Sequence, residues 1–221
     1  MSIERFPWLN DAIRAHQKIT FPSSSIIEGE SGLAKKQLAK YFAQKLLCSD
    51  EFAPCGVCNS CNYFLAGSHP DYCFLDNDKC SSVLHIYSKA KKEALNSNQI
   101  EGIRALNEFI AMTNSVSEKR IAIIFEAHSM NINAQNALLK TLEELPENKH
   151  IFLVSNQRKY FLPTIYSRSS LITIKNPDPH YLDQWIADQG YIDFSTLNFA
   201  PDSTPLQIEY LINNDLAGQY I

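Results

Sequence analysis

Basic residues are missing from the C-terminal part of the sequence. After Lys175 the chain has seven Asp or Glu residues and no Lys or Arg, so the first 175 residues carry 20 basic residues against the other 17 of the 24 acids. Neutralising the phosphates of a nucleic acid requires cations, so this acidic segment is not expected to contact DNA. The change of charge coincides with Pro177 and Pro179, and we therefore expect a domain boundary near residue 176.

Long apolar runs are also missing. No segment reaches the roughly 18 apolar residues that span a bilayer, and the N-terminal segment from Met1 to Asp11 lacks the apolar core of a signal peptide. With 45% hydrophobic and 20% charged residues, the composition is that of a globular protein, and we expect a cytoplasmic one. In a reducing compartment, six cysteines indicate metal ligands or free thiols rather than disulfides.

Short apolar runs alternate with segments of helical periodicity. The expected strands cover residues 25–28, 72–75, 120–126, 150–155 and 170–174, and the expected helices cover residues 33–46, 100–110 and 134–145. This alternation predicts an α/β fold with a parallel sheet and helices on both faces. Two further helices, around residues 178–189 and 204–214, predict a small helical lid domain over residues 177–221 after an α/β domain over residues 1–176.

Four cysteines stand where the first long helix ends, with the spacing C-x6-C-x2-C-x2-C. They are Cys48, Cys55, Cys58 and Cys61. Two overlapping Cys-x-x-Cys steps and a fourth nearby sulfur can supply a tetrahedral set of thiolates for zinc. The sequence therefore predicts a metal-binding module inserted at residues 48–62. Of the other two cysteines, Cys73 is expected to be a small core residue, and Cys80 lies beside an apolar stretch.

Residues 29–36 lie between an expected strand and an expected helix, where a phosphate-binding Walker A loop is found. Such a loop reads G-x-x-x-x-G-K-[ST], and its final hydroxyl binds magnesium. Gly29 and Lys35 match, but Ala34 replaces the second glycine and Lys36 replaces the hydroxyl residue. Because an ammonium group cannot ligate a cation, the loop of Gly29, Gly32 and Lys35 is predicted to retain its shape without binding ATP and magnesium productively.

The strand that carries the Walker B position ends in a single acid. An active ATPase of this type has two, one for magnesium and one to polarise the attacking water. Here Glu126 stands alone after Ile124-Phe125. Glu126 is interpreted as a vestige of that site or as a residue that caps the strand, and we favour the vestige. Two altered motifs in one site predict a subunit that does not hydrolyse ATP.

Several further segments extend a family pattern over most of the chain. They are residues 6–8 (FPW), 46–48 (LLC), 67–71 (GSHPD), 134–144 (AQNALLKTLEE) and 163–168 (PTIYSR). With these segments, the chain resembles the delta-prime subunits of bacterial DNA polymerase III clamp loaders, which are AAA+ proteins. The gamma and tau subunits share the cysteine module and the NALLKTLEE segment, so the altered nucleotide motifs favour delta-prime.

The resemblance implies roles for particular residues. The four cysteines would bind one structural zinc ion, and Arg168 would act in trans as an arginine finger, an effect on the order of 10³–10⁵ in rate. Without the resemblance, Arg168 would be a solvated surface charge. Ser169 stands where the family usually has cysteine. Ser155 and Asn156 fall at the sensor-1 position, and the lid offers no sensor-2 arginine.

Two histidines are expected to make local hydrogen bonds rather than to bind metal. They are His69 and His128, and the reason is that four thiolates already complete a tetrahedral site.

The implied function is that of a non-hydrolysing subunit of the DNA polymerase III holoenzyme. It would assemble with gamma or tau and delta, and help to load the sliding clamp onto primed DNA. Family members continue into a collar domain that this sequence, ending at Ile221, does not reach. Two alternatives stay open at this point: an active gamma/tau-like ATPase, and a zinc-ribbon protein that binds nucleic acid. The second has less support because residues 55–61 contain no Lys, Arg or aromatic residue.

Overall fold

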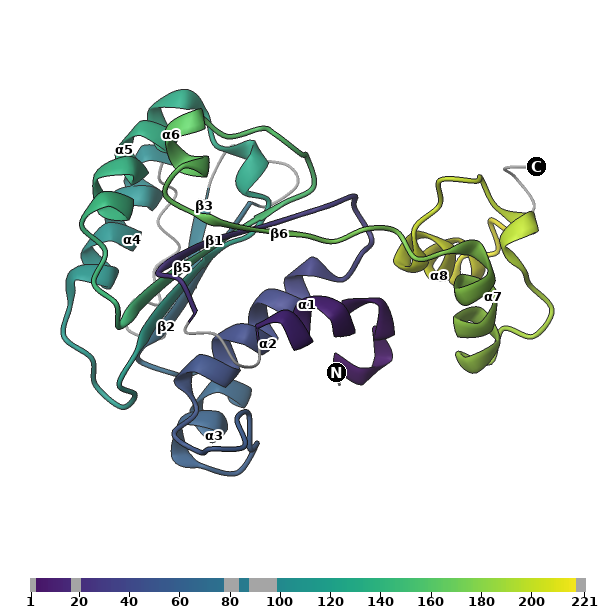
Figure 1. Cartoon of the computed structure of the whole chain (residues 1–221), viewed down its shortest axis with the longest axis horizontal. Coiled ribbons are helices and arrows are strands. Elements are labelled where there is room, and N and C mark those ends of the chain that lie inside the picture. The colour runs from purple at the N-terminus through teal and green to yellow at the C-terminus, as the bar shows by residue number, and fades with distance from the viewer. Residues whose placement is uncertain (1–2, 17–20, 78–83, 88–98, 218–221) are drawn as a thin grey trace.

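A computed structural model describes residues 3–16, 21–77, 84–87 and 99–217 of the chain. It has two parts (Figure 1): a sheet with helices on both faces, and a group of short helices formed by the C-terminal residues. No helix within these residues is both long and apolar enough to cross a membrane. Cys80 lies outside the described residues, whereas Cys73 is fully buried, as predicted.

The sheet has the strand order β3-β2-β4-β5-β1-β6, and its strands are β1 (Ser24–Glu28), β2 (Tyr72–Asn77), β3 (Leu84–Tyr87), β4 (Arg120–Ile124), β5 (Lys149–Ser155) and β6 (Ser170–Thr173). The five strands β2, β4, β5, β1 and β6 run parallel, which confirms the predicted α/β fold. An edge strand that the sequence did not predict, β3, pairs antiparallel with β2. The strand expected to reach residue 126 ends at Ile124, because Glu126 adopts a left-handed φ of 49° that cannot continue a strand.

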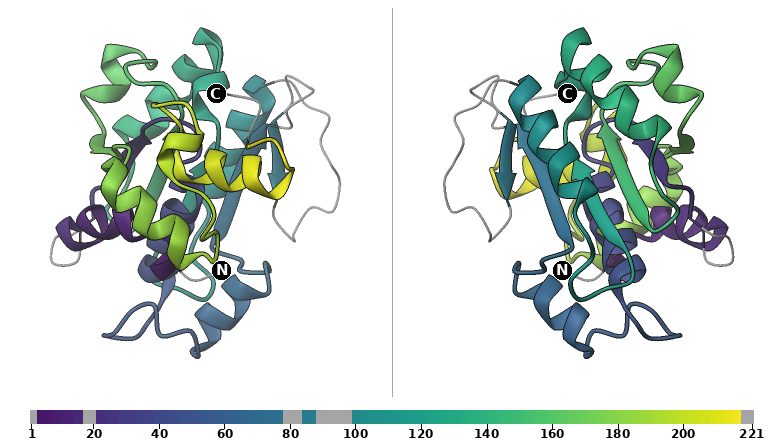
Figure 2. Two further views of the ribbon diagram at one scale, coloured as in Figure 1. Left: turned by 90° about the vertical axis from the view of Figure 1, so that its right-hand side faces the viewer. Right: turned by 90° about the vertical axis from the view of Figure 1, so that its left-hand side faces the viewer.

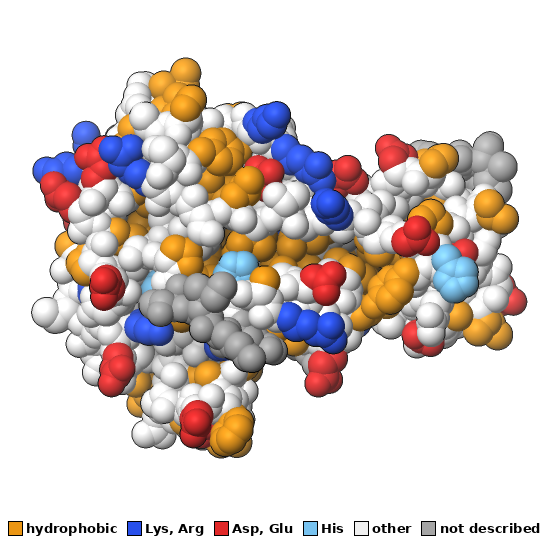
Figure 3. Space-filling view, in the orientation of Figure 1, with side chains coloured by type: hydrophobic (Ala, Val, Ile, Leu, Met, Phe, Trp, Pro, Cys, Tyr) orange, Lys and Arg blue, Asp and Glu red, His pale blue; other side chains and the backbone are white. Residues whose placement is uncertain are grey.

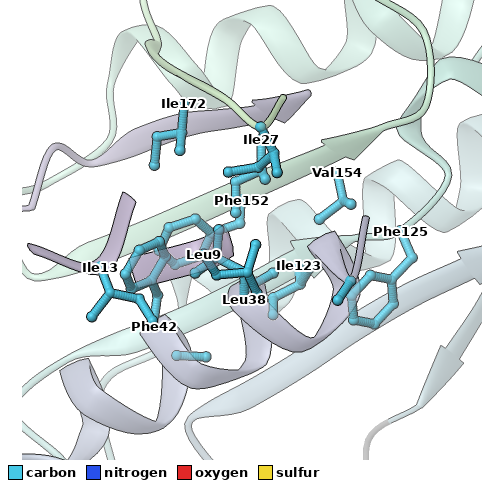
Figure 4. Packing of buried hydrophobic residues seen from close by; sticks show 14 of the residues in the cluster. Leu9, Ile13, Ile27, Leu38, Phe42, Ile123, Phe125, Phe152, Val154 and Ile172 are labelled. Atoms are coloured by element: carbon cyan, nitrogen blue, oxygen red, sulfur yellow. The ribbon is translucent and has the colours of Figure 1, made fainter. Parts of the chain in front are cut away.

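Alternate residues of the central strands serve two separate cores, because successive side chains of a strand point to opposite faces. On one face, β4 contributes Ile121 and Ile123 to a core with Phe42 of α2 (Lys35–Leu47). The same core includes residues of η1 (Ile3–Arg5), η2 (Pro7–Leu9) and α1 (Asn10–Ala15). Figure 4 shows how Phe42 and Phe152 meet beneath the sheet; their ring centroids are 6.2 Å apart.

On the opposite face, β4 contributes Ala122 and Ile124. They pack against α4 (Gln99–Ala111), α5 (Ile132–Glu143) and α6 (Pro163–Tyr166), where Leu106, Leu138 and Ile165 are fully buried. The turn η3 (Ala127–Ser129) leads from β4 into α5, whose N-terminus is capped by Asn131. Figure 2 shows the two helical layers on either side of the sheet.

The cysteine segment and the C-terminal residues extend beyond this sheet. The chain leaves α2 at Cys48, forms a loop, and continues in α3 (Asn59–Leu65) at one end of the molecule (Figure 1). The two expected C-terminal helices are present as α7 (Pro179–Asp188) and α8 (Pro205–Asn213), joined through η4 (Thr196–Asn198). They enclose a small core of their own, built around Trp185, Ile186 and Ile208.

Candidate functional site

The loop between β1 and α2 contains two glycines in backbone conformations that other residues rarely adopt. Gly29 and Gly32 have φ values of 156° and 85°, and a Cβ atom at Gly29 would lie 2.4 Å from the carbonyl oxygen of Ile174. Both positions therefore require glycine. Ala34 adopts a left-handed φ of 58°, which is unfavourable for any residue with a Cβ atom. A residue with a Cβ atom therefore adopts a left-handed conformation where the Walker A pattern has its second glycine.

The N-terminus of α8 covers this loop. Thr204 Oγ1 donates to the carbonyl oxygen of Ser31 at 2.7 Å, and the Leu206 N–H donates to that of Gly32 at 3.2 Å. A Cβ atom at Gly32 would lie only 2.1 Å from Thr204 Oγ1, so glycine is also what allows this close approach. A pocket of about 910 Å³ remains between the loop and the helical segment, and it contains Glu30 and Asp202 but no Lys or Arg among its described lining residues.

Lys35 lies at the position of the phosphate-binding lysine but is turned inward. Its side chain is buried, and its ammonium group donates to the carbonyl oxygen of Glu30 in the same loop. Burial lowers the pKa of Lys35 to about 8, although the nearby carboxylates of Glu126 and Glu30 act in the opposite direction. The ammonium group that would contact phosphate oxygens in a Walker A loop therefore bonds to the backbone of its own loop.

Lys36 places a positive charge where a working loop holds magnesium through a hydroxyl group. Its Nζ lies 3.2 Å from Glu126 Oε1 and 3.2 Å from Asp76 Oδ1, at the end of β2. It also lies 5.4 Å from the centre of the Phe125 ring. The ammonium group thus pairs with Glu126, the acid expected at the Walker B position, and with a second carboxylate that the sequence did not single out.

The other oxygen of Glu126 is also engaged. Asn156 Nδ2 donates to Glu126 Oε2 at 2.7 Å, and His128 Nε2 lies 3.5 Å from the same oxygen. The Asn156 N–H donates to His128 Nδ1, as expected for a histidine in a local hydrogen-bond network. Ser155 Oγ donates to the carbonyl oxygen of Gln157. Both sensor-1 residues therefore have partners within the chain.

Two tryptophans link the N-terminal segment to the C-terminal helices. The Trp8 and Trp185 rings meet edge to face with centroids 5.3 Å apart, and Trp8 Nε1 donates to the carbonyl oxygen of Leu33 in the loop. Trp185 Nε1 donates to the carbonyl oxygen of Arg5, whose guanidinium forms an ion pair with Glu209 of α8. The C-terminal helices are thus attached both to the nucleotide loop and to the N-terminus.

The four predicted cysteines come together at the carboxyl end of α2. Among the described residues, they form a cluster whose ligand atoms all lie within 4.8 Å of one another. Cys48 Sγ lies 3.6 Å from Cys55 Sγ and 3.8 Å from Cys58 Sγ. A tetrahedral zinc site with Zn–S bonds of about 2.3 Å requires sulfurs about 3.8 Å apart, so this spacing fits the ion.

Backbone N–H groups are aimed at the sulfurs. Asp50 N and Cys55 N donate to Cys48 Sγ, Cys58 N donates to Cys55 Sγ, and Cys61 N donates to Cys58 Sγ, at 3.4–3.5 Å. The hydrogen bond from the Cys61 N–H is the main cause that lowers the pKa of Cys58, whereas burial raises the pKa of Cys48 and of Cys61. Hydrogen bonds of this kind stabilise thiolates, the form in which cysteine binds a metal. The donor set can therefore hold a metal ion.

A buried polar network connects the cysteine cluster to the sheet. His69 Nδ1 accepts from the Asp71 N–H, which leaves Nε2 to contact Ser60 Oγ of α3 at 2.8 Å and Ser117 Oγ at 3.2 Å. Both hydroxyl groups donate to the carbonyl oxygen of Leu47, the last residue of α2. His69 is thus a structural hydrogen-bonding residue, as predicted from the sequence.

Asp71 is the centre of this network. Its carboxylate accepts from the N–H groups of Ser115, Val116 and Ser117 and pairs with Arg120 Nη2 at 2.8 Å. Burial alone would raise the pKa of Asp71, but these hydrogen bonds hold it below its usual value. The sequence did not reveal this role, because the partners lie more than forty residues away along the chain.

Arg168 lies at the amino end of the parallel strands, whereas the loop lies at their carboxyl end. It precedes β6, which starts beside Ser25 near the beginning of β1, whereas the nucleotide loop follows the end of β1. Its guanidinium is partly exposed, pairs with Glu143 Oε1 at 2.8 Å, and contacts the carbonyl oxygen of Thr164 at 3.3 Å. Arg168 is therefore not part of the nucleotide-loop cluster of its own chain.

Sequence reasoning thus located the loop, the cysteines and Glu126, but not Asp76, Asp71 or Thr204. Each of these three acts through a partner distant in the sequence. The GSHPD segment was the only signal that pointed to one of them, because it contains Asp71.

Comparison with known proteins shows which family the chain resembles. The model of a family described as DNA polymerase III, delta subunit, matches residues 8–178. The delta-prime subunit of DNA polymerase III from Pseudomonas aeruginosa is 32% identical over 164 residues, which are 73% of this chain and 46% of that protein. The delta-prime subunit from Escherichia coli is 25% identical over 188 residues, or 82% of this chain and 52% of that protein.

A solved structure has the same fold. It is a DNA polymerase III gamma subunit-related protein from Thermotoga maritima, with a TM-score of 0.51 and 20% identity, and the match covers 86% of this chain and 55% of that one. The chain spans about half the length of the Pseudomonas and Escherichia relatives that it matches. The family match and the 32% identity show that the chain belongs to the delta-prime subunits of DNA polymerase III.

Proposed function

We propose that this chain is a non-hydrolysing subunit of a DNA polymerase III clamp loader. It would act in DNA replication by helping to place the sliding clamp on primed DNA, in contact with gamma or tau and delta subunits. The observation that carries this proposal is the pairing of Lys36 with Glu126 and Asp76. The Lys36 ammonium group lies where an active ATPase would bind its magnesium ion. Phosphoryl transfer depends on that ion to neutralise the negative charge that develops in the transition state.

The surrounding contacts support the same reading. Lys35 is buried against its own loop, and the N-terminus of α8 bonds to two loop carbonyl groups. The pocket beside the loop presents carboxylates rather than cations among its described lining residues. A nucleotide polyphosphate would meet negative charge there, which opposes binding.

Arg168 is proposed to stabilise the γ-phosphoryl group in the site of a neighbouring ATPase subunit. Arg168 lies at the end of the sheet opposite to the loop of its own chain, and this position suits a residue that acts in trans. The ion pair with Glu143 is between half-exposed side chains, and such pairs stabilise by only about 0–1 kcal/mol. A stronger anion, such as a γ-phosphate, can therefore displace Glu143.

The cysteine cluster is proposed to bind one structural zinc ion through Cys48, Cys55, Cys58 and Cys61. The ion would supply tetrahedral cross-links between the end of α2 and the start of α3. Residues 1–176 and 177–221 are proposed as the two domains. Because the second segment has no Lys or Arg, limited digestion with trypsin should release it whole, by cleavage after Lys175.

The test of the trans arginine is a reconstitution. The chain would be mixed with gamma, delta, sliding clamp and primed DNA, and DNA-stimulated ATP turnover would be compared for wild type, Arg168→Ala and Arg168→Lys. We expect both variants to lower turnover by about 10³-fold at the dependent site. Arg158→Ala, which removes another exposed arginine, is the control. Turnover that is equal in all variants would contradict the role of Arg168.

The test of the inactive loop uses intrinsic fluorescence. The chain has two tryptophans, and both lie at the contact between the N-terminal segment and α7. Titration of the wild type with MgATP should leave their emission unchanged, and the isolated chain should release no phosphate. Hydrolysis by the isolated wild type would overturn the proposal in favour of an active gamma-like ATPase.

A further inference from the structure

The cysteine module forms one wall of a groove with an unusual mixture of side chains. The groove has a volume of about 960 Å³ and lies between the module and the loop that precedes β4. Its apolar lining residues include Val57 and Val116, which are 77% and 45% exposed. Phe52, next to the groove, is 85% exposed, so a large apolar ring is in contact with water.

The charge around this groove is negative. Asp50, Glu51 and Glu118 line it, and Lys119 is the one cation among its described lining residues. The sequence from residue 46 to residue 71 contains no Lys or Arg. Figure 3 shows acidic and hydrophobic side chains next to each other at the end of the molecule where Figure 1 places α3. This surface repels phosphate groups and attracts cationic ones.

Both walls of the groove are held in place before any partner arrives. On the module side, the Phe52 N–H donates to Asp50 Oδ1 at 2.8 Å, which fixes the turn that exposes the Phe52 ring. On the other side, three consecutive N–H groups at residues 115–117 donate to the buried Asp71 carboxylate. A preformed groove loses little conformational entropy on binding, which favours recognition of a short segment.

We infer that this groove binds a cationic, apolar segment of a partner protein. Leucine or aromatic side chains of that segment contact Phe52, Val57 and Val116. Its Lys or Arg side chains pair with Glu51 and Glu118. The acidic rim supplies the charge complementarity that selects such a segment. Exposed aromatic side chains are typical anchors of protein interfaces. The inference concerns a surface on the far end of α2 from the loop that follows β1, and it rests on the proposed zinc site but not on the proposed role in clamp loading.

The test uses the full chain in its metal-loaded form. A fluorescein-labelled peptide of repeated Leu-Lys-Lys-Leu units is the probe, a matched Leu-Glu-Glu-Leu peptide is the charge control, and fluorescence anisotropy reports binding. We expect binding of the cationic peptide only, weakened about tenfold by Phe52→Ser/Val57→Ser. Glu51→Lys/Glu118→Lys should weaken it by a similar factor, with less effect at high salt. Asp50 is left unchanged because it fixes the Phe52 turn.

The matched controls lie on the C-terminal helical segment. Leu197→Ser and Asp193→Lys remove an exposed apolar residue and an exposed acid far along the chain, and both should leave the affinity unchanged. Circular dichroism and metal content should be the same in all variants, because the substituted side chains are exposed. Equal affinity in the groove variants and the controls would overturn the inference. So would self-association through Phe52, or binding of a single-stranded oligonucleotide that Phe52→Ser reduces.

Discussion

The two ends of α2 differ in how their polar groups are used. At the amino end, Lys35 donates to a backbone carbonyl group, Lys36 pairs with two carboxylates, and the N-terminus of α8 covers the loop. At the carboxyl end, Cys48 begins a module whose four sulfurs lie within 4.8 Å of one another and whose side chains of Phe52 and Val57 are exposed to solvent. One helix thus joins a loop whose polar groups are bonded within the chain to a module with exposed apolar side chains.

At the amino end the charges are balanced within the chain, because the Lys36 ammonium group pairs with the carboxylates of Glu126 and Asp76. In the cysteine module the sulfurs accept hydrogen bonds from backbone N–H groups, and the segment from residue 46 to residue 71 contains no Lys or Arg that could balance the charge of thiolates. Its residues are too few and too polar to form a core, so a metal would stabilise it in place of burial. The predictions below separate the two ends.

The largest effect is expected at the cysteine end. Removal of the metal by a chelator, or Cys58→Ser, should unfold the module and lower the melting temperature of the chain. Structural zinc in small fingers contributes on the order of 10 kcal/mol to folding. Metal analysis and thermal denaturation measure both effects, and Cys73→Ala, which alters a cysteine outside the cluster, should retain the metal. Freshly purified reduced protein without metal would contradict the zinc assignment.

A smaller effect is expected where the module joins the sheet. Asp71→Ala leaves the buried Arg120 guanidinium and three N–H groups without their acceptor. Such a loss costs about 3–5 kcal/mol of unfolding free energy, measurable by urea denaturation. Asp50→Ala removes an exposed carboxylate near the same groove and should cost less than about 1 kcal/mol. Equal costs for the two variants would show that the Asp71 network does not join the module to the sheet.

The amino end of α2 should show a pH dependence of stability. The pKa of Lys35 is lowered to about 8 in the folded chain from 10.5, so the unfolded chain binds more protons between these values. The unfolding free energy of the wild type should therefore rise with pH across this window, by up to about 3 kcal/mol relative to Lys35→Met. Lys40→Met, on the exposed side of the same helix, should not remove this rise. Parallel pH profiles for wild type and Lys35→Met would contradict the buried position of Lys35.

The smallest effect on stability is expected for Arg168. Its ion pair with Glu143 is half-exposed, so Arg168→Ala should change the unfolding free energy by less than about 0.5 kcal/mol. Chemical denaturation of the purified variant measures this. A large loss of stability would assign Arg168 a structural role and would remove the basis for comparing turnover in the reconstituted loader.

The sequence alone was enough to predict the main strands and helices and the residues of the cysteine cluster and the altered motifs. Apolar periodicity predicted five parallel strands and the helices between them, because burial of both faces of a sheet leaves a strong pattern. Cysteine spacing predicted the cluster, since four ligands within fourteen residues are a local signal. Lys36 and Glu126 showed that the nucleotide motifs were altered.

The partners of the residues in the altered motifs became visible only in the tertiary structure. The partners of Lys36 come from the ends of two different strands, and Thr204 reaches Ser31 across 173 residues of sequence. The antiparallel edge strand β3 and the Asp71 network likewise depend on pairings between distant segments. Such contacts leave no periodic trace along the chain, because they are fixed by packing in space rather than by spacing in sequence.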